Sequence, residues 1–315
     1  EGLMRSRARK ATLMAAAVAG AALLSGCGFG TGPGTRHARV VVTGDFGTRS
    51  YGSASERRVP GAETVMSLLE RHFKVTTRYG GGYVESIGGH AGGSGQRDWF
   101  YYVNGFQAAK GAAVTGVHAG DHVWWDLHDW RATDSIPAVV GSYPEPFTSG
   151  LGGRRFPTLL NCGAGLQRAC DKVGAALHAY GVKAADQVLG TGSGSDSLAV
   201  VIGTWRQIKG VIAAQLIAAG PRSSGVYAQF TGTSGQALEL DDPRGDVART
   251  LRGSAGLIAA TGDAALGQPT WFVTGTDEAG VMAAASAFTA AKLAHHFAVA
   301  VIGHRIIPVP LAPGS

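Results

Sequence analysis

The stretch DWFYYVNG, residues 98–105, sets four large aromatic side chains in a row and then ends in Asn-Gly. Aromatic residues make up only 8% of the 315 residues, so this concentration distinguishes the segment from the rest of the chain. Aromatic side chains favour strands, and Asn-Gly is typical of a tight turn between two strands. The sequence therefore predicts a strand that turns at Asn104-Gly105, with rings that form either a core or a binding surface.

A second aromatic strand is predicted at HVWWDLHDW, residues 122–130. Because side chains alternate between the faces of a strand, the apolar face carries Val123, Trp125 and Leu127, and we assign it to the core. The opposite face mixes rings with polar groups: His122, Trp124, Asp126, His128 and Trp130. In 98–105 the same alternation separates Trp99, Tyr101 and Val103 from Phe100, Tyr102 and Asn104. One aromatic face is therefore expected to be buried and the other to be available.

We predict that the available rings contact a ligand, because such rings suit stacking on a flat molecule such as a corrin ring or a sugar. The predicted ligand-binding residues are Trp99, Tyr101, Trp124, His128 and Trp130. The alternative is that both faces are covered, one by a helix and the other by the second half of the chain. No metal site is predicted, because His122 and His128 would lie ~20 Å apart along one strand.

The residues before these strands indicate a small α+β unit. Strands are predicted at ARVVVTGDF, FKVTTRYG and YVESIGG, and AETVMSLLERH has apolar residues at helical spacing. This order, with one short helix crossing a sheet, favours a β-grasp-like arrangement over residues 38–132. The stretches TVMSLLE, GGGYVESIGG, DWFYYVNG and GDHVWWD resemble the domain family shared with the C-terminal domain of transcobalamin and intrinsic factor.

That resemblance covers about a third of the chain and implies both a fold and a ligand class. The fold of the family is β-grasp-like, and in its animal members the domain closes over one face of cobalamin. For this chain, the resemblance implies that cobalamin or another corrinoid binds as a ligand. It does not imply a permanently bound cofactor. The bacterial members of the family are mostly uncharacterised surface proteins.

The second half of the chain, residues 151–315, predicts an α/β domain. Strands at FPTLLNC, SLAVVIGTW and PTWFVTGTD alternate with helices at AGLQRACDKVGAALHAYG, RQIKGVIAAQLIAAG and EAGVMAAASAFTAAKLAHHF. Near-continuous apolar strands are typical of a sheet that is covered on both faces.

The loop TGTDEAG before the last helix predicts a helix cap at Thr276 or Asp277, with an anion site as the alternative. We interpret TGSGSDS, 191–197, as a surface loop and DDPRGD, 241–246, as a turn, with calcium binding as the alternative for the turn.

The three cysteines have two different predicted roles. Cys162 and Cys170 are eight residues apart, which is ~12 Å on one continuous helix and too far for a disulfide. A bond therefore requires Cys162 to lie before the helix that holds Cys170, and NCGAG is typical of such a loop. We predict this disulfide, with two buried free thiols as the alternative.

Cys27 follows Leu24-Ser25-Gly26, which resembles the lipobox of bacterial lipoproteins and implies lipidation at Cys27.

The N-terminus predicts export from the cytoplasm. A basic region precedes the 14 apolar residues 11–24, which are fewer than the ~20 that cross a bilayer as a helix. Residues 1–26 are therefore interpreted as a lipoprotein signal peptide, with an ordinary signal peptide as the alternative. Palmitate-type acyl chains on Cys27 would hold the protein at the extracytoplasmic face of the cell membrane. Residues 27–37 form a flexible tether in this interpretation, and the Pro- and Gly-rich residues 133–150 link the two domains.

Composition narrows the class of protein. Hydrophobic residues at 45% and charged residues at 16% favour packed domains over disorder. No dense Lys/Arg run follows the N-terminus, so no nucleic-acid partner is predicted. No Gly-x-Ser-x-Gly, His-Glu-x-x-His or Gly-x-Gly-x-x-Gly motif occurs, and we do not expect an enzyme.

The sequence thus predicts a cell-surface, lipid-anchored protein that captures a small ligand, cobalamin or another corrinoid, and passes it to a membrane importer. Two other hypotheses stay open at this stage. One is a structural or adhesive module of the cell envelope, and the other is an enzyme that acts on wall glycan.

Overall fold

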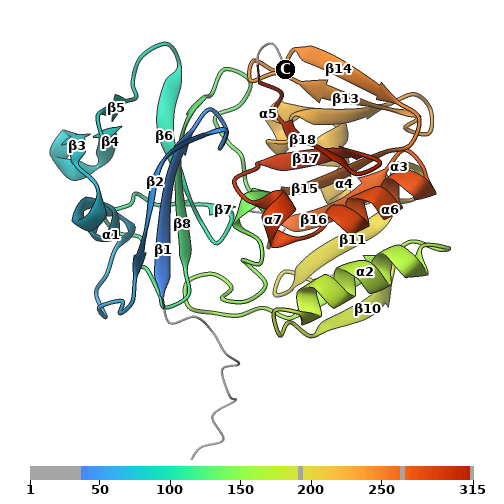
Figure 1. The fold of residues 1–315 in the computed structure, drawn as a ribbon, viewed down its shortest axis with the longest axis horizontal. Coiled ribbons are helices and arrows are strands. Elements are labelled where there is room, and N and C mark those ends of the chain that lie inside the picture. Colours follow the sequence, from blue (N-terminus) through green and yellow to red (C-terminus); the bar gives the residue numbers. More distant parts are fainter. Residues whose placement is uncertain (1–36, 191–193, 263–266, 313–315) are drawn as a thin grey trace, which may run out of the picture. The chain divides into compact units, whose positions relative to one another are not determined.

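A computed structural model describes residues 37–190, 194–262 and 267–312 (Figure 1). The predicted signal peptide, Cys27 and the tether up to residue 36 lie outside the described residues. No helix among the described residues is long and apolar enough to cross a membrane. The described residues form one compact unit.

The first half of this unit is built on a five-stranded sheet with the order β2-β1-β8-β6-β7. Its strands are β1 (Ala38–Gly44), β2 (Arg49–Glu56), β6 (Arg97–Val103), β7 (Phe106–Gln107) and β8 (His122–Asp129). β1 runs parallel to β8, whereas the other pairings are antiparallel. A small second sheet contains β3 (Val75–Arg78), β4 (Tyr83–Ile87) and β5 (His90–Ala91). The expected β-grasp-like fold class is confirmed.

Helix α1 (Val65–His72) covers one face of the five-stranded sheet. It begins at Thr64, whose side chain accepts a hydrogen bond from the Ser67 backbone N–H, which satisfies a donor that a helix start otherwise leaves unpaired. Its buried residues pack with the inward face of β8 that alternation predicted, and the two groups share one core: Val65, Leu68, Leu69, Val123, Trp125 and Leu127.

The second half contains a seven-stranded sheet with the order β10-β9-β11-β16-β15-β17-β18. Its strands are β9 (Thr158–Cys162), β10 (Ala184–Val188), β11 (Leu198–Thr204), β15 (Ala255–Thr261), β16 (Thr270–Gly275), β17 (Ala298–Ile302) and β18 (Arg305–Val309). The first four strands in this order are parallel, and the remaining pairings are antiparallel. The α/β class predicted for this half is therefore confirmed, with a mixed sheet.

Both faces of this sheet are covered. One face packs against α2 (Gln167–His178) and α6 (Glu278–Ala287), which contact each other. The other face packs against α4 (Ile212–Ala218) and a three-stranded sheet of β12 (Ala228–Thr231), β13 (Ala237–Asp241) and β14 (Val247–Arg252). The short helices α3 (Trp205–Ile208), α5 (Pro221–Ser224), α7 (Ala290–Leu293), η1 (Tyr79–Gly81) and η2 (Val140–Ser142) complete the fold.

Two predicted helices are each divided in the structure. The segment 278–297 forms α6 and α7, separated by Phe288, which leaves the helical region with φ −74° and ψ 73° while its ring is fully buried. Packing of that ring therefore outweighs the local helix preference of the Ala-rich sequence. The segment 206–220 forms α3 and α4 because Val211 is extended, with φ −70° and ψ 133°.

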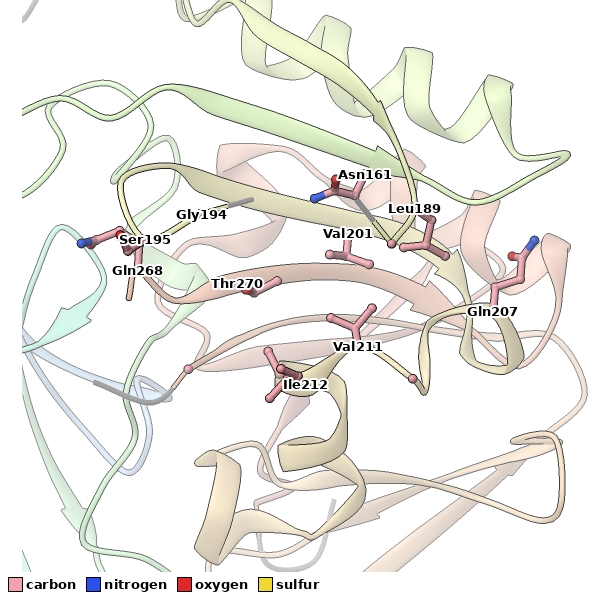
Figure 2. A pocket seen from close by; sticks show the side chains of 14 residues that line it. Asn161, Leu189, Gly194, Ser195, Val201, Gln207, Val211, Ile212, Gln268 and Thr270 are labelled. Atoms are coloured by element: carbon pink, nitrogen blue, oxygen red, sulfur yellow. The ribbon is translucent and has the colours of Figure 1, made fainter. Parts of the chain in front are cut away.

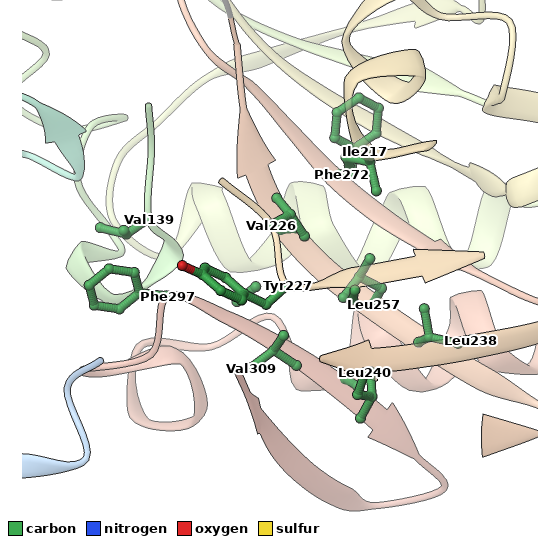
Figure 3. Packing of buried hydrophobic residues seen from close by; sticks show 14 of the residues in the cluster. Val139, Ile217, Val226, Tyr227, Leu238, Leu240, Leu257, Phe272, Phe297 and Val309 are labelled. Atoms are coloured by element: carbon green, nitrogen blue, oxygen red, sulfur yellow. The ribbon is translucent and has the colours of Figure 1, made fainter. Parts of the chain in front are cut away.

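The connecting residues 133–150 lie between the two halves and are mostly buried. Val139 donates its backbone N–H to the Gly105 carbonyl on one side, and Val140 donates to the Phe297 carbonyl on the other. One hydrophobic cluster includes Val41 and Trp124 of the first half, Val139 of the connection and Phe297 of the second. Figure 3 shows Val139 and Phe297 within this cluster. The domain boundaries at 132 and 151 stay a prediction, and the core is continuous across them.

The predicted disulfide is present between Cys162 and Cys170, whose Cα atoms are 6.2 Å apart. Cys162 ends β9 and Cys170 lies in the first turn of α2. The bond therefore joins a strand to the following helix, as the spacing argument required.

Candidate functional site

The mixed face of β8 is sealed by the second half of the protein. Trp124 is 0% exposed and His128 is 1% exposed. The Phe297 ring lies 5.2 Å from the Trp124 ring and 5.3 Å from the His128 ring. The expectation that these two side chains are open to a ligand is therefore wrong. The alternative prediction, that this face is covered by the second half of the chain, holds for Trp124 and His128. An apolar segment far along the sequence packs on both side chains.

Asp126, also fully buried, organises the polar groups of this face. It accepts hydrogen bonds from the Thr43 hydroxyl at 2.5 Å and from the backbone N–H of Gly47 at 2.8 Å. His128 Nδ1 lies 2.9 Å from the second carboxylate oxygen. Trp124 Nε1 in turn donates to the Thr43 hydroxyl at 2.7 Å. Buried polar groups that satisfy one another in this way stabilise a unique arrangement, provided that all of them are paired.

The turn between β1 and β2 fills the space between the two halves. Phe46 has a left-handed backbone, with φ 57°, and its backbone N–H donates to Asp126 at 3.1 Å. Its ring lies 4.7 Å from the His128 ring and 5.2 Å from the rings of Tyr227 and Phe297. A left-handed backbone is strained for a bulky residue and persists only where the surroundings fix it. The Asp126 carboxylate and the aromatic packing provide that constraint.

Trp99 and Tyr101, two other predicted ligand contacts, lie on the opposite face of the sheet. Trp99 is 7% exposed and donates from Nε1 to the His90 carbonyl at 3.2 Å. The Tyr101 ring stacks on Trp125 at 4.8 Å, within the core beneath α1. Alternation had already separated these residues from the mixed face, so the five predicted residues do not converge on one surface.

Trp130 differs from the other four because it is only partly buried and faces a small polar cluster. Its Nε1 donates to Asp98 Oδ2 at 2.9 Å, and the Tyr83 hydroxyl donates to the other oxygen of the same carboxylate. Desolvation and the Asp98 carboxylate together raise the pKa of Tyr83 to about 12. Tyr79, 86% exposed, lies edge-on to Tyr83 with ring centroids 6.4 Å apart. Trp130 is thus linked through Asp98 to Tyr83, whose ring lies next to the exposed ring of Tyr79.

The sealed face also holds buried groups that lack a protein partner. Among the described residues, these include the hydroxyls of Tyr102 and Tyr227 and a ring nitrogen each of His122, His295 and His296. Desolvation, followed by the Arg39 and His295 charges, lowers the pKa of His122 to about 3. Burial also lowers the pKa of His295 and of His296. These imidazoles are therefore held neutral at physiological pH.

The other candidate motifs have structural roles. Asp277 caps α6 by accepting from the Gly280 backbone N–H at 2.7 Å, so the capping interpretation is confirmed. In DDPRGD, Asp242 Oδ1 accepts from the backbone N–H of Arg244 at 2.7 Å, which is the hydrogen-bond pattern of a turn. Burial and neighbouring acidic side chains raise the pKa of Asp241 to about 6.

In the part of the chain that the structure describes, no group of three or more His, Cys, Asp or Glu could hold a metal ion.

The second half contains a cavity of about 660 Å³, which we call the β9–α4 pocket (Figure 2). Its volume falls within the range of ~300–1,000 Å³ that is usual for sites of small molecules. The described residues that line it are Asn161, Leu189, Gly190, Gly194, Ser195, Val201, Gln207, Gly210, Val211, Ile212, Ala213, Gly262, Gln268 and Thr270. None of them carries a charge or an aromatic ring.

The sheet register explains where this pocket lies. Asn161 of β9 is the register partner of Val201 of β11, so both side chains point to the same face of the sheet. On that face α4 contacts β12 and β15, whereas the β9 side is not covered by the helix. In Figure 2, Asn161, Val201 and Thr270 on neighbouring strands lie opposite Val211 and Ile212 at the start of α4.

Asn161 is the one strongly buried polar side chain of the pocket. It is 5% exposed, and its Oδ1 has no hydrogen-bond partner. Gln207, by contrast, is fixed within the protein, because Oε1 accepts from Thr204 N at 2.9 Å and Nε2 donates to the Ala164 carbonyl at 2.9 Å. The pocket therefore offers a largely apolar wall, and the unpaired Asn161 Oδ1 is enclosed by the surrounding protein.

Sequence reasoning did not predict this pocket. The loop 191–197 was expected to be a surface loop; Gly194 and Ser195 line the pocket, and residues 191–193 lie outside the described residues. One signal was present in the sequence: Asn161 interrupts the otherwise apolar stretch FPTLLNC. A polar residue at a strand position that faces inward requires a partner, and that partner can be a ligand.

Comparison with known proteins finds one family model that matches part of the first half. A family described as "Domain of unknown function (DUF4430)" matches residues 62–129. A solved structure described as "a putative metal binding protein from Ruminococcus gnavus ATCC 29149" is 20% identical. The match covers 30% of this chain and 97% of that one, with a TM-score of 0.25. No curated protein matches the chain.

Proposed function

We propose that this protein is an extracytoplasmic binding protein that holds a small ligand in the β9–α4 pocket. The observation that carries the proposal is a cavity of about 660 Å³ whose described lining is uncharged and largely apolar. This volume lies within the range of ~300–1,000 Å³ that is usual for sites of small molecules. A binding role, without catalysis, fits a pocket whose described lining contains no acid, base or nucleophile other than hydroxyl groups.

The cellular setting of the proposal comes from the sequence alone. A lipid on Cys27 would place the pocket at the outer face of the cell membrane, and delivery to a membrane importer would follow capture. Cobalamin is retained as a probe because residues 38–132 resemble a cobalamin-binding domain family. Its stacking on Trp124 or His128 is excluded by their burial, so a corrinoid would have to use another surface.

The first test of this proposal is a binding screen with a matched pair of variants. Gly210 lines the pocket, and a Cβ added there meets no atom within 4 Å, so Gly210→Trp places a large ring in open space. Gly61 is equally open and lies outside the pocket, which makes Gly61→Trp the control. A library of neutral small molecules and cobalamin would be screened by native mass spectrometry against the purified full-length protein. Hits that Gly210→Trp removes and Gly61→Trp retains support the proposal, and a complete absence of such hits contradicts it.

A second candidate function is adhesion to a wall polymer through the exposed ring of Tyr79, beside the partly buried Tyr83. The 86% exposure of Tyr79 favours it, because exposed rings stack on sugars. Pull-down with purified wall polysaccharide would test it. Retention that is lost in Tyr79→Ala supports adhesion, and no retention excludes it.

A further inference from the structure

We infer that the protein docks on the anionic phospholipid headgroups of the membrane through a basic hollow at the start of β1. The basic hollow is lined by four exposed residues: His37, Arg39, Ser55 and Arg57. The inference rests on the membrane location in the proposed function, and it is independent of the β9–α4 pocket. It gives a second surface of the protein a partner and a test of its own.

The basic hollow is produced by the pairing of β1 with β2, which lie side by side (Figure 1). Arg39 on β1 is the register partner of Ser55 on β2, and the same antiparallel register places His37 opposite Arg57. Side chains two residues apart on a strand lie on the same face, so all four point to one side of the sheet. Two guanidinium groups, an imidazole and a hydroxyl therefore lie together at one end of the strand pair.

The charges of Arg39 and Arg57 are not neutralised by a neighbouring acid. Neither side chain forms an ion pair with a carboxylate of the described residues. Glu56 precedes Arg57 in the sequence, but alternation puts its side chain on the other face, where it accepts from Arg71 at 3.0 Å. The basic hollow therefore keeps two full positive charges at the surface.

The sequence that precedes the basic hollow is basic as well. Residues 27–36 read CGFGTGPGTR, with no acidic residue and with Arg36 directly before His37. In residues 1–26 the only acid is Glu1, against three arginines and one lysine. In the proposed mature chain, which begins at Cys27, this side of the basic hollow thus adds positive charge.

The place of the basic hollow in the chain identifies the membrane as the partner. Ten residue steps separate Cys27 from His37, and a chain of this length spans at most ~35 Å. A lipid on Cys27 would hold the basic hollow within this distance of the headgroups. Each Arg near an anionic membrane surface increases affinity about fivefold, and phosphate oxygens accept strong hydrogen bonds from guanidinium groups. Contact there would fix one orientation of the protein on its tether.

Partition of the purified full-length protein onto lipid vesicles tests this inference. Vesicles of phosphatidylcholine alone would be compared with vesicles that also contain phosphatidylglycerol. The double variant Arg39→Gln/Arg57→Gln removes two charges from the basic hollow. The control Arg168→Gln/Arg206→Gln removes two exposed charges from the second half. All proteins carry the same N-terminal segment, so the ratios of their partition coefficients isolate the substituted arginines.

The expected effects follow from charge at the membrane surface. On anionic vesicles Arg39→Gln/Arg57→Gln should lower the partition coefficient about 30-fold, and the control pair should lower it less than about threefold, since charges far from the surface are screened. Arg39→Lys/Arg57→Lys, which keeps both charges, should bind like the parent. All of these proteins should partition alike onto neutral vesicles. If the Gln pair does not fold, Ser55→Glu places a carboxylate in the basic hollow and should lower partition about fivefold.

The opposite results would overturn the inference. Equal losses in the two Gln pairs would show that only total charge matters. Parent-like binding of Arg39→Gln/Arg57→Gln would exclude the membrane as the partner, as expected if the N-terminal residues or a soluble anion occupied the basic hollow. Titration with glycerol 1-phosphate, followed by NMR, would then identify the soluble anion by saturable binding that the Gln pair loses. Partition is measured without a lipid on Cys27 and away from the β9–α4 pocket, so failure here leaves ligand capture to the library screen.

Discussion

Two regions of this protein combine apolar walls with buried polar atoms, and they differ in how those atoms are satisfied. On the mixed face of β8, the Asp126 carboxylate pairs with Thr43, Gly47, Phe46 and His128, and the second half covers the whole group. In the β9–α4 pocket, Asn161 Oδ1 has no partner and the cavity beside it is open. An aromatic and polar strand face can therefore be an internal interface, while the more apolar strand β9 borders the pocket that we propose as the site.

Not every buried polar group at the sealed face has a hydrogen-bond partner. Tyr102 and Tyr227 are buried at the sealed face with unpaired hydroxyls. Desolvation raises the pKa of both phenols. Neither residue is among the described residues that line the β9–α4 pocket. An unpaired group indicates a ligand site only where space for the ligand is present as well.

The largest expected effect is at the sealed face, in Asp126→Ala. This change leaves several buried partners unpaired and releases the left-handed Phe46 turn, so the free energy of unfolding should fall by ~3–5 kcal/mol. Urea unfolding measures it, with Asp186→Ala on an exposed position of β10 as control, expected within about 0.5 kcal/mol of the parent. A loss below about 1 kcal/mol in Asp126→Ala would mean that this face is not a structural interface.

A second effect concerns the neutral imidazoles at the same interface. The pKa of His122 is lowered to about 3 in the folded protein, so the unfolded chain takes up the proton first as pH falls below ~6.5. Stability is therefore lost progressively between about pH 6.5 and 3, and His122 alone should account for about 2 kcal/mol at pH 5.

Unfolding of the parent and of His122→Asn across this pH range checks the effect. The raised pKa values of Asp241 and Glu145 act in the opposite direction, stabilising the folded state as pH falls, but they are present in both proteins. The difference in unfolding free energy between the two proteins isolates His122. A difference that does not change between pH 7 and pH 5 would show that the imidazole is not sealed.

The smallest expected effects come from removing unpaired buried groups. Tyr102→Phe deletes a hydroxyl without a partner, and Asn161→Leu removes an amide whose buried oxygen has no partner, next to a cavity. Each should leave the unfolding free energy within about 0.5 kcal/mol of the parent or raise it. Thermal unfolding of both variants measures this. A loss of more than about 2 kcal/mol in Asn161→Leu would indicate that Asn161 is needed for folding.

The sequence predicted the elements of the first half because each depends on neighbouring residues. Alternation in 122–130 correctly assigned Val123, Trp125 and Leu127 to the core beneath α1. Alternation says which residues share a face but not what covers that face. The group that covers Trp124 is Phe297, which lies far along the chain and beyond any local pattern.

The pocket was not predicted for a related reason. Within its local sequence, Asn161 is one polar residue in a strand. Its place in a pocket depends on Val211 and Ile212, which come from a segment some fifty residues later. The disulfide, by contrast, was predictable, because the eight-residue spacing excluded one geometry and left a strand-to-helix bond.

The most direct test of the central claim, that the pocket and not the aromatic face binds the ligand, is a map of backbone amide chemical shifts. Uniformly ¹⁵N-labelled protein would be titrated with the tightest-binding molecule of the library screen. The account predicts saturable shifts centred on Asn161, Leu189, Val201 and Ile212, with the amides of 98–103 and 122–130 unchanged. Saturable shifts centred on 98–103 and 122–130, or no saturable shift at Asn161, would contradict it.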